Sequence, residues 1–527
     1  MGAASLTFRS LAQAKGRFLK HSGDLVAAAE ALEMGRKLDL ADKWINSKSS
    51  KFQLRAGLIE RGESVVSLFT KHEGDSRGYL TDMQTMWFET EAGGAYLRAG
   101  EVAMALKLFK AVEKHFDDFE DDQIDFHAYC LRKFTLRAYV SLLRLEDRLR
   151  GHAFFTGAAA GAVRCYLLLA DLRSHYSSKS EGAAELDYTG MSAAERKKAK
   201  TKARKLELRK EKAAAERAER EAERKKQLEA AQKLADKEEE EAESADGAGG
   251  KKRPARRRRD IPVDMDPDGA KLLEDASKDP LGAAHALLKT VRRFAPGNLQ
   301  THLDAFDVEV RRGKYLQAMR ALVAAAELCH RETRPALGAM HPELLARLPP
   351  FLALVAAGKV RYAPWAGKAT CLADVNKPVD HAVKLSPVAK EVIAEAAAAL
   401  CAGAPDLLKD PLAALKQAHA ALHAGVDIAR CRAASRALLT IDPADKAPLA
   451  ATVAAVERAV AQQPNDAKLR FAQLDRVREA LAEMDAPQPL RERYDAVLKA
   501  VFARASTLGN PTPYAAAETK AMQGLDD

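Results

Sequence analysis

Small and apolar residues recur at fixed offsets along the first part of the chain, and their spacing predicts paired helices. In residues 83–116 the pattern places Gly93 and Tyr96 on one helix, Gly100 at a turn, and Ala105 and Phe109 on the next helix. A helix-turn-helix repeat needs this order, because the glycine closes the turn and the small residues let two helices approach closely. We therefore expect a helical hairpin over residues 83–116.

Two earlier segments repeat the pattern. In residues 8–40 the corresponding positions are Gly16, Leu19, Gly23, Ala28 and Leu32. In residues 41–71 they are Ser50, Gln53, Gly57 and Gly62. Residues 298–330 give a further copy with Phe306, Gly313, Ala318 and Leu322. Three adjacent hairpins are about the minimum that buries a shared core, so the sequence predicts an all-α, tetratricopeptide-type solenoid.

The rest of the chain also has mainly helical periodicity. Residues 129–139 form an unbroken helical pattern that should pack against the third hairpin, and residues 121–177 should be helical with a break near 151–155. Residues 173–190 look like a loop, and no alternating strand pattern is visible. Further helices are expected over 341–357, 387–403, 411–439, 446–463, 466–485 and 488–506, bounded by prolines.

The predicted organisation has four parts. They are tetratricopeptide-like helical repeats at 8–177, a charged helix with a basic low-complexity linker at 190–260, a C-terminal helical-repeat region at 265–506, and a flexible tail at 507–527. The charged helix has mixed signs at helical spacing and too few leucines for a heptad seam, which favours a solvated single helix over a coiled coil.

Composition excludes some classes of protein. No run of about 18 apolar residues appears and the N-terminus lacks the order of a signal peptide, so neither a membrane span nor secretion is predicted. The six cysteines are widely spaced without a Cys-x-x-Cys pair, and we interpret them as reduced thiols of a cytosolic or nuclear protein. They are Cys130, Cys165, Cys329, Cys371, Cys401 and Cys431.

The net charge of +10 is concentrated in one region. A basic block ends the charged segment and comprises Lys251, Lys252, Arg253, Arg256, Arg257, Arg258 and Arg259. It is either a solvated linker or a contact for polyanions or nuclear import. No aromatic residues are interleaved, so base stacking is not indicated.

The sequence carries no recognisable catalytic or metal-binding motif. A phosphate-binding loop, a His-Glu-x-x-His helix and a Gly-x-Ser-x-Gly elbow are all missing. His127, Glu146 and Asp147 have no evident nucleophile beside them, so we interpret them as ordinary polar residues. An enzyme in its own right therefore has no support from the residues.

One group of cations is more suggestive. Arg17 and Lys20 lie near the end of one predicted first helix, and Lys48, Lys51 and Arg55 share a face of the next. First helices of adjacent repeats stand side by side, so these residues, together with Lys43, could form one basic pocket. Such a pocket would suit a highly phosphorylated small molecule. The alternative is a solvated basic face.

Several stretches resemble the auxiliary subunit of the N-terminal acetyltransferase A (NatA) complex. They are ADKWINSK (41–48), MQTMWFETE (83–91), DDQIDFHAYCLRK (121–133), LRAYV (136–140), LEDRLR (145–150) and THLDAF (301–306). The likeness covers most of residues 8–330 in order and fades beyond about 335.

This resemblance implies a non-catalytic superhelix that cradles and activates a separate catalytic acetyltransferase. It also implies contact with the ribosome and nascent chains, a small regulator with a ubiquitin-associated domain, and a cytoplasmic location with a nuclear pool. No catalytic residue, metal or catalytic cofactor is expected. Inositol hexakisphosphate is implied as a structural ligand, and the positions carried over for it are Arg17, Lys20, Lys43, Lys48, Lys51 and Trp87.

The resemblance also leaves alternatives open. Family members carry a long array of repeats ahead of this region, so the sequence is interpreted as truncated, as part of a split subunit, or as a shortened scaffold. The rival function is a generic helical-repeat adaptor whose basic arm binds RNA or directs nuclear import.

Overall fold

The computed structural model describes most of the helical part of the chain. The described residues are 2–70, 76–183, 266–330, 336–357, 359–362, 379–382, 385–425, 427–462 and 471–502. The chain divides into two compact units, Met1–Arg173 with Asp266–Asp527 and, separately, Ser174–Met265. The first unit is the one analysed below. The basic block at 251–259, nearly all of the predicted charged segment, and Cys371 lie outside the described residues.

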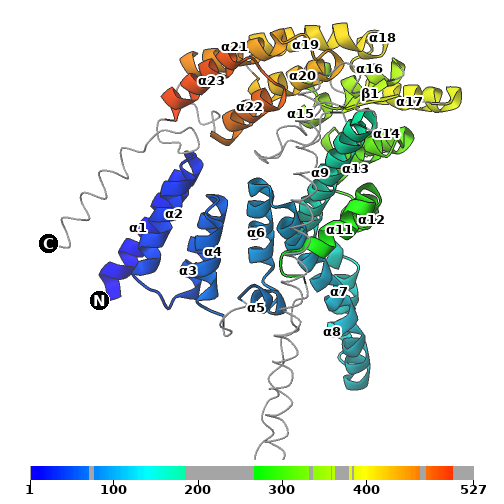
Figure 1. Ribbon diagram of the computed structural model, residues 1–527. Helices are drawn as coiled ribbons and strands as arrows, with labels where there is room; N and C mark the ends of the chain where they lie inside the picture. The colour runs from blue at the N-terminus through cyan, green and yellow to red at the C-terminus, as the bar shows by residue number, and fades with distance from the viewer. Residues whose placement is uncertain are drawn as a thin grey trace, which may run out of the picture. The chain divides into compact units, whose positions relative to one another are not determined.

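The N-terminal part of the first unit is built from helices (Figure 1). In chain order they are α1 (Gly2–His21), α2 (Leu25–Lys37), α3 (Lys43–Arg55), α4 (Ile59–Ser67), α5 (Ser76–Asp82), α6 (Met86–Ala99), α7 (Val102–Lys133), α8 (Leu136–Glu146), the 3₁₀ helix η1 (Leu149–Gly151) and α9 (Ala153–Ala183). The pairs α1–α2, α3–α4 and α6–α7 pack as antiparallel hairpins, which confirms the prediction of stacked helix pairs.

The turns of these hairpins are closed by glycines in the left-handed region. Gly100 has φ +89° after α6, and its N–H bonds back to the last turn of that helix. A side chain would be strained there, so glycine is the residue that ends the helix without cost. Gly23, Gly57 and Gly313 occupy the equivalent turns with φ of +88°, +82° and +71°.

Small residues at the helix crossings explain the rest of the pattern. A Cβ added to Gly62 would lie 2.9 Å from Leu54 Cγ, and one on Gly93 would lie 2.9 Å from Phe109 Cε1. A Cβ on Gly16 would collide with Leu32. In each pair the glycine on one helix makes room for a large side chain on the other, so the offsets seen in the sequence are packing constraints.

Phe109 links this arrangement to α9. Its ring fills the space beside Gly93 of α6 and also beside Gly161 of α9, where an added Cβ would lie 2.6 Å from two ring carbons. Phe109 is nearly fully buried and belongs to the main hydrophobic core, with Phe116 and Phe155 in edge contact nearby. One ring therefore holds three helices together.

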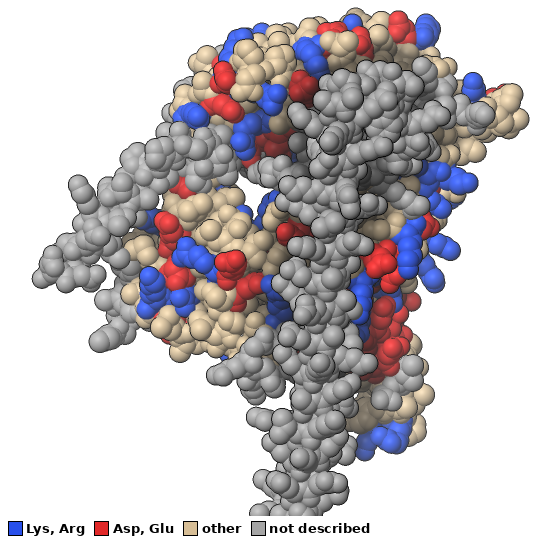
Figure 2. All heavy atoms as spheres, in the orientation of Figure 1, with Lys and Arg blue, Asp and Glu red and all other residues tan. Residues whose placement is uncertain are grey.

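The C-terminal part continues with shorter helices and a small hairpin of strands. It consists of α11 (Ala270–Lys278), α12 (Pro280–Phe294), α13 (Leu299–Arg311), α14 (Tyr315–Cys329), η3 (Leu337–Ala339), α15 (Pro342–Leu345), α16 (Leu348–Ala356), β1 (Lys359–Tyr362), β2 (Val379–Ala382), α17 (Pro387–Leu400), α18 (Asp406–Lys409), α19 (Pro411–Gly425), α20 (Ile428–Ile441), α21 (Ala447–Gln462), α22 (Phe471–Glu483) and α23 (Gln488–Val501). Charged side chains of both signs are spread over its outer surface (Figure 2).

Local sequence accounts for many of these helix starts. Asp279 accepts a hydrogen bond from the Gly282 N–H, with Pro280 as the first helical residue of α12. Asn298, Ser386 and Asp427 cap α13, α17 and α20 in the same way. Each cap satisfies backbone N–H groups that have no partner inside the helix.

A buried ion pair joins the two parts of this unit. Arg311 of α13 donates to both carboxylate oxygens of Asp171 on α9, at 2.8 and 3.0 Å. The two side chains are 4% and 1% exposed. The main hydrophobic core also extends from Leu54 to Ala455, so the helices before and after the 184–265 segment share one interior.

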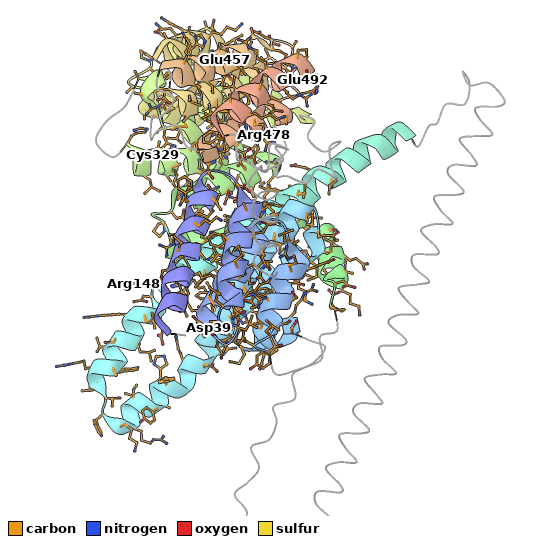
Figure 3. The ribbon with its side chains drawn as sticks, turned by 90° about the vertical axis from the view of Figure 1, so that its left-hand side faces the viewer. Asp39, Arg148, Cys329, Glu457, Arg478 and Glu492 are labelled. Atoms are coloured by element: carbon orange, nitrogen blue, oxygen red, sulfur yellow. The ribbon has the colours of Figure 1, made fainter. Side chains whose placement is uncertain are left out.

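The structure corrects the predicted helix boundaries. The unbroken helix expected over 129–139 ends at Lys133, because Phe134 adopts a left-handed conformation with φ +55° and Thr135 N–H bonds back to the Cys130 carbonyl. No glycine marks this stop in the sequence. The resulting α7–α8 hairpin extends away from its neighbours instead of packing on the third repeat (Figures 1 and 3).

Other boundaries also differ. The loop expected from residue 173 is helical to Ala183. The segment 411–439 is two helices, since Gly425 ends α19 and Asp427 caps α20. Residues 341–357 divide into α15 and α16.

The expectation of no strands was wrong for one short element. Strands β1 and β2 pair antiparallel, with Lys359 opposite Ala382 and Tyr362 opposite Val379. Each has four residues, which is too short for alternation to stand out in the sequence.

Helix α9 contains a long apolar segment, although the sequence did not predict a membrane span. Residues Ala153–Leu172 of α9 are long and apolar enough to cross a membrane by length and composition, and 61% of that segment is buried inside the protein. Phe155, Val163 and Cys165 of this segment are core residues. Its apolar character is thus explained by its position between other helices.

Two glycines of α9, one turn apart, provide a matched test of the packing. We expect Gly161→Ala to lower the melting temperature, because the new methyl group would press on the Phe109 ring, at a cost of about 1–3 kcal/mol. Gly157 has no atom within 4 Å of an added Cβ, so Gly157→Ala should raise stability by up to about 1 kcal/mol. Circular dichroism melts measure both, and a Gly161→Ala protein as stable as wild type would contradict the packing.

Candidate functional site

Four of the cations singled out in the sequence lie at the carboxyl ends of α1 and α3. Arg17 and Lys20 belong to the end of α1, and Lys51 and Arg55 to the end of α3. We call these four residues the basic cluster. The charges of Arg55, Arg17 and Lys51 all act on the Lys20 ammonium. The structure therefore brings cations from two neighbouring repeats together.

Polar contacts between α2 and α3 set the direction in which the α3 cations point. Glu33 of α2 accepts hydrogen bonds from Ser49 Oγ at 3.0 Å and Gln53 Nε2 at 3.1 Å. Ser49 and Gln53 are one turn apart and face α2. Lys51 and Arg55 follow each of them by two residues, which is about 200° around the helix, so they lie on the opposite side of α3.

Glu91 of α6 is the acidic partner of the cluster. Its carboxylate accepts hydrogen bonds from Arg55 Nε at 2.9 Å and Nη2 at 2.5 Å, and it pairs with Lys51 Nζ at 2.9 Å. The Glu91 side chain is 19% exposed. Burial opposes its ionisation, but the hydrogen bonds from Arg55 and Lys51 outweigh burial and lower the pKa of the carboxyl. Glu91 thus stays charged and fixes two of the four cations.

For Lys20, burial and the neighbouring positive charges act on the pKa in the same direction. Burial, followed by the nearby charges of Arg55 and Arg17, lowers the pKa of its ammonium group. Neither Arg17 nor Lys20 forms an ion pair with a described residue. An anion reaching this place would relieve the repulsion between the cations.

The structure places the remaining candidate residues elsewhere. Lys43 begins α3, about 12 Å along the helix from Lys51, and its ammonium lies 5.9 Å from the Phe69 ring centre. Lys48 lies 5.4 Å from the Trp44 ring centre. Trp87 packs edge-on against Phe88 and lies one turn before Glu91 on α6. The structure therefore shows no contact between these three residues and the cations of the cluster.

Sequence reasoning missed two participants. Glu91 lies in the stretch 83–91, which was noted only for its family resemblance. Arg98 of α6 donates a hydrogen bond to the Leu54 carbonyl at 3.0 Å, at the end of α3. Their approach depends on how the third repeat stacks on the second, which local spacing does not show. The positions of Lys20 and Arg55 in last turns also complement the helix dipoles.

The described residues offer no other site with comparable chemistry. No group of three His, Cys, Asp or Glu side chains that could hold a metal was found among them. His127 pairs with Glu146 at 2.7 Å inside the α7–α8 hairpin, with no nucleophile beside it. Burial raises the pKa of Cys165 to about 12 and that of Cys401 to about 11, so these thiols are not poised to react.

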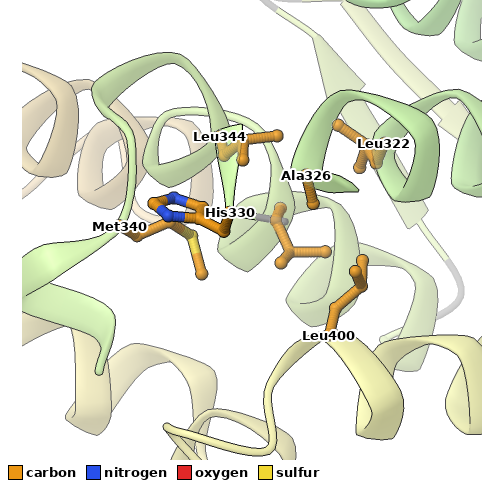
Figure 4. A pocket seen from close by; sticks show the side chains of 7 residues that line it. Leu322, Ala326, His330, Met340, Leu344 and Leu400 are labelled. Atoms are coloured by element: carbon orange, nitrogen blue, oxygen red, sulfur yellow. The ribbon is translucent and has the colours of Figure 1, made fainter. Parts of the chain in front are cut away.

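A pocket between α14, α15, α16 and α17 is small and mainly apolar (Figure 4). Its lining consists of Leu322, Ala326, His330, Met340, Leu344, Leu348 and Leu400. His330 Nε2 accepts a hydrogen bond from the His341 N–H at 3.2 Å, so that nitrogen serves a backbone contact. This pocket is a small gap lined mainly by apolar side chains of four helices.

The ion pairs of Glu91 make a prediction about pH. Its pKa is lowered on folding, so its stabilising effect is complete above the unfolded value of about 4.3 and is lost as the pH falls through the folded value. We expect Glu91→Gln to reduce stability by about 1 kcal/mol at pH 7, and the gap to wild type to narrow progressively as the pH falls below the unfolded value of about 4.3. Thermal melts of both proteins at several pH values measure this difference in stability.

The control for this prediction is Glu30→Gln, which changes an exposed carboxylate of α2. It should leave the melting temperature nearly unchanged at every pH. A gap for Glu91→Gln that stays constant from pH 7 to pH 3 would contradict the role assigned to its charge.

Comparisons with known proteins indicate the family to which this chain is similar. The model of the family "N-terminal acetyltransferase A, auxiliary subunit" matches residues 4–325. The N-terminal acetyltransferase A complex auxiliary subunit NAA15 of Arabidopsis thaliana is 40% identical over 316 residues, which are 60% of this chain and 31% of that protein. The N-alpha-acetyltransferase 16, NatA auxiliary subunit, of Homo sapiens is 44% identical over 205 residues, 39% of this chain and 23% of its own length.

A solved structure described as "Structure of Naa15/Naa10 bound to HypK-THB" is also similar to this chain. It is 29% identical with a TM-score of 0.47, over 74% of this chain and 41% of the other. The chain spans less than a third of the curated relatives' length. The family match confirms the resemblance seen in the sequence and covers more than half of the residues, so this chain belongs to the family of N-terminal acetyltransferase A auxiliary subunits.

Proposed function

We propose that this chain is a non-catalytic auxiliary subunit of a NatA-type N-terminal acetyltransferase. It would scaffold and activate a separate catalytic subunit that acetylates nascent chains during translation. The observation that carries the proposal is the family match over residues 4–325. The stacked helix pairs support it, because a solenoid presents extended surfaces on which a partner can bind.

Activation by a scaffold has a simple physical basis. A subunit that binds the active conformation of its partner more tightly than the inactive one shifts the partner toward the active form. A repeat surface suits this role, since its helices are fixed by their neighbours and can hold a partner in one shape.

The basic cluster is the proposed place of inositol hexakisphosphate. Arg17, Lys20, Lys51 and Arg55 supply cations from two repeats, and Lys43, Lys48 and Trp87 border them. A ligand with several adjacent phosphates would compete with Glu91 for Arg55 and Lys51 while engaging Lys20 and Arg17. Charge-assisted hydrogen bonds of this kind are about twice as strong as neutral ones.

Further partners follow from the same proposal. They are the ribosome with its nascent chains and a small regulator with a ubiquitin-associated domain, in the cytoplasm with a nuclear pool. The block 251–259, which lies outside the described residues, is the proposed contact for ribosomal RNA phosphates.

Co-purification tests the proposal. The full chain, co-expressed with the catalytic acetyltransferase subunit of the same organism, should retain that subunit through affinity and size-exclusion steps. A generic adaptor would not retain it. Mass spectrometry of the recovered complex identifies the partner, and failure to recover it under low-salt conditions would contradict the proposed function.

Charge-reversal variants test whether the ligand binds in the basic cluster or nearer to Lys43. We expect Lys20→Glu to weaken inositol hexakisphosphate binding at least tenfold, a loss of about 1.4 kcal/mol, because it places a carboxylate among the cations. Lys43→Glu adds the same charge about 12 Å away along α3 and should cost less than about threefold. Isothermal titration calorimetry measures both affinities. Equal losses in the two variants would show that the ligand does not sit in the basic cluster.

A further inference from the structure

The α7–α8 hairpin exposes the most extensive set of large apolar side chains among the described residues. Phe134 at its tip is 83% exposed, and no residue of α8 is buried. The other exposed members are Phe126, Tyr129 and Leu131 on α7 and Leu136, Val140, Leu143 and Leu145 on α8. Exposed apolar side chains so close together mark an interaction surface.

These residues are left over after the hairpin has formed its own interior. The His127 and Tyr139 rings meet edge to face at 5.5 Å, His127 Nε2 lies 2.7 Å from Glu146 Oε1, and Cys130 is buried. Phe126 and Tyr129 are one turn apart on α7. Leu136, Val140 and Leu143 follow one another at the spacing of one face of α8, beside the interior. The exposed residues are thus not needed to close the hairpin.

The hairpin is firmly attached at its root. Arg150, just after α8, donates to Glu120 at 2.6 and 2.8 Å and to Asp117 at 2.7 Å, both on α7. Phe116 packs against Phe155 of α9 with ring centres 5.2 Å apart. The apolar surface is therefore carried on a preformed arm, and a partner would not need to order it first.

Charges divide the arm into two ends. The α7 side of its root carries Asp117, Asp118, Glu120, Asp121 and Asp122, the α8 side carries Arg144, Arg148 and Arg150, and its tip carries Arg132, Lys133 and Arg137. Arg150 pairs with Asp117 and Glu120, so the acidic excess of the root comes from Asp118, Asp121 and Asp122. Glu120 and Arg132 lie on one continuous helix, about 18 Å apart along its axis. Figure 2 shows acidic residues over the upper part of the hairpin and basic residues at its lower end, and Figure 3 shows the arm from the side with Arg148 near it.

We propose that the α7–α8 hairpin is a docking arm for an amphipathic helix of the partner subunit. That helix would place its acidic residues over the tip of the hairpin, its basic residues over the root, and an apolar stripe between them. This inference rests on the proposed function, which supplies a partner subunit. The distance between the two charged ends is about three helical turns, the length of an ordinary helix in a globular protein. Opposite charges at both ends fix the direction in which that helix lies.

The charge division favours a protein over a lipid surface. An anionic bilayer would attract Arg132, Lys133 and Arg137 but would be repelled by the carboxylates of the root. A second copy of this chain, packed antiparallel, would also match the charges. It is therefore tested as a competing occupant.

The test uses the full chain and the catalytic subunit in a binding assay such as biolayer interferometry. The triple variant Leu136→Ser, Val140→Ser, Leu143→Ser removes the α8 stripe, and we expect at least 100-fold weaker binding. The variant Arg132→Glu, Lys133→Glu, Arg137→Glu reverses the tip and should weaken binding about tenfold at low salt, with a smaller loss at high salt.

Matched controls are Leu316→Ser on α14 and Val388→Ser on α17, which are also exposed apolar residues. Both should bind the catalytic subunit as wild type does. All variants should keep the wild-type melting temperature and inositol hexakisphosphate affinity, because the arm contributes to neither the core nor the basic cluster.

The outcomes separate the two proposals. If wild type binds the catalytic subunit and both hairpin variants bind equally well, the docking arm is refuted while the proposed function stands. If wild type does not bind, the proposed function fails and the inference with it. A wild-type dimer in light scattering that the stripe variant converts to a monomer, or flotation with phosphatidylserine vesicles that the variant abolishes, would assign the arm to another occupant and overturn the proposal.

Discussion

The Phe109 ring, held between Gly93 and Gly161, is the contact on which the N-terminal helix pairs depend. A single aromatic side chain fills the space left by two missing Cβ atoms, one on α6 and one on α9. The same pairing of a glycine on one helix with a large side chain on its neighbour recurs at Gly16 with Leu32 and at Gly62 with Leu54. Close approach of the helices therefore depends on a glycine at one position and a leucine or phenylalanine at a fixed offset from it.

This rule explains how much could be predicted. The turn glycines and small residues act within one hairpin, so their spacing predicted the repeats and the fold class, whereas the family was indicated by the resemblance of whole stretches such as residues 83–91 and 121–133. The pair between Asp171 and Arg311 spans 140 residues, and the contact of Glu91 with Arg55 spans 36, so periodicity could not reveal either. The stop at Phe134 was also hidden, because a non-glycine residue takes the left-handed position. The sequence therefore grouped Arg17, Lys20, Lys51 and Arg55, which the structure brings together, but it could not indicate Glu91.

The fixed helices present two surfaces of different chemistry. The basic cluster lies at the ends of α1 and α3, where stacking of repeats brings cations together and Glu91 holds two of them. The α7–α8 hairpin instead offers apolar side chains with an acidic root and a basic tip. Each surface is built from side chains of neighbouring helices, so its geometry depends on how those helices pack.

Acetyl transfer from acetyl-CoA to a peptide amino terminus tests this account most directly, measured with the chain alone, the catalytic subunit alone, and the two together. The account predicts no turnover by the chain alone and a higher rate for the mixture than for the catalytic subunit by itself. Turnover by the purified chain, or a mixture no faster than the catalytic subunit, would contradict it.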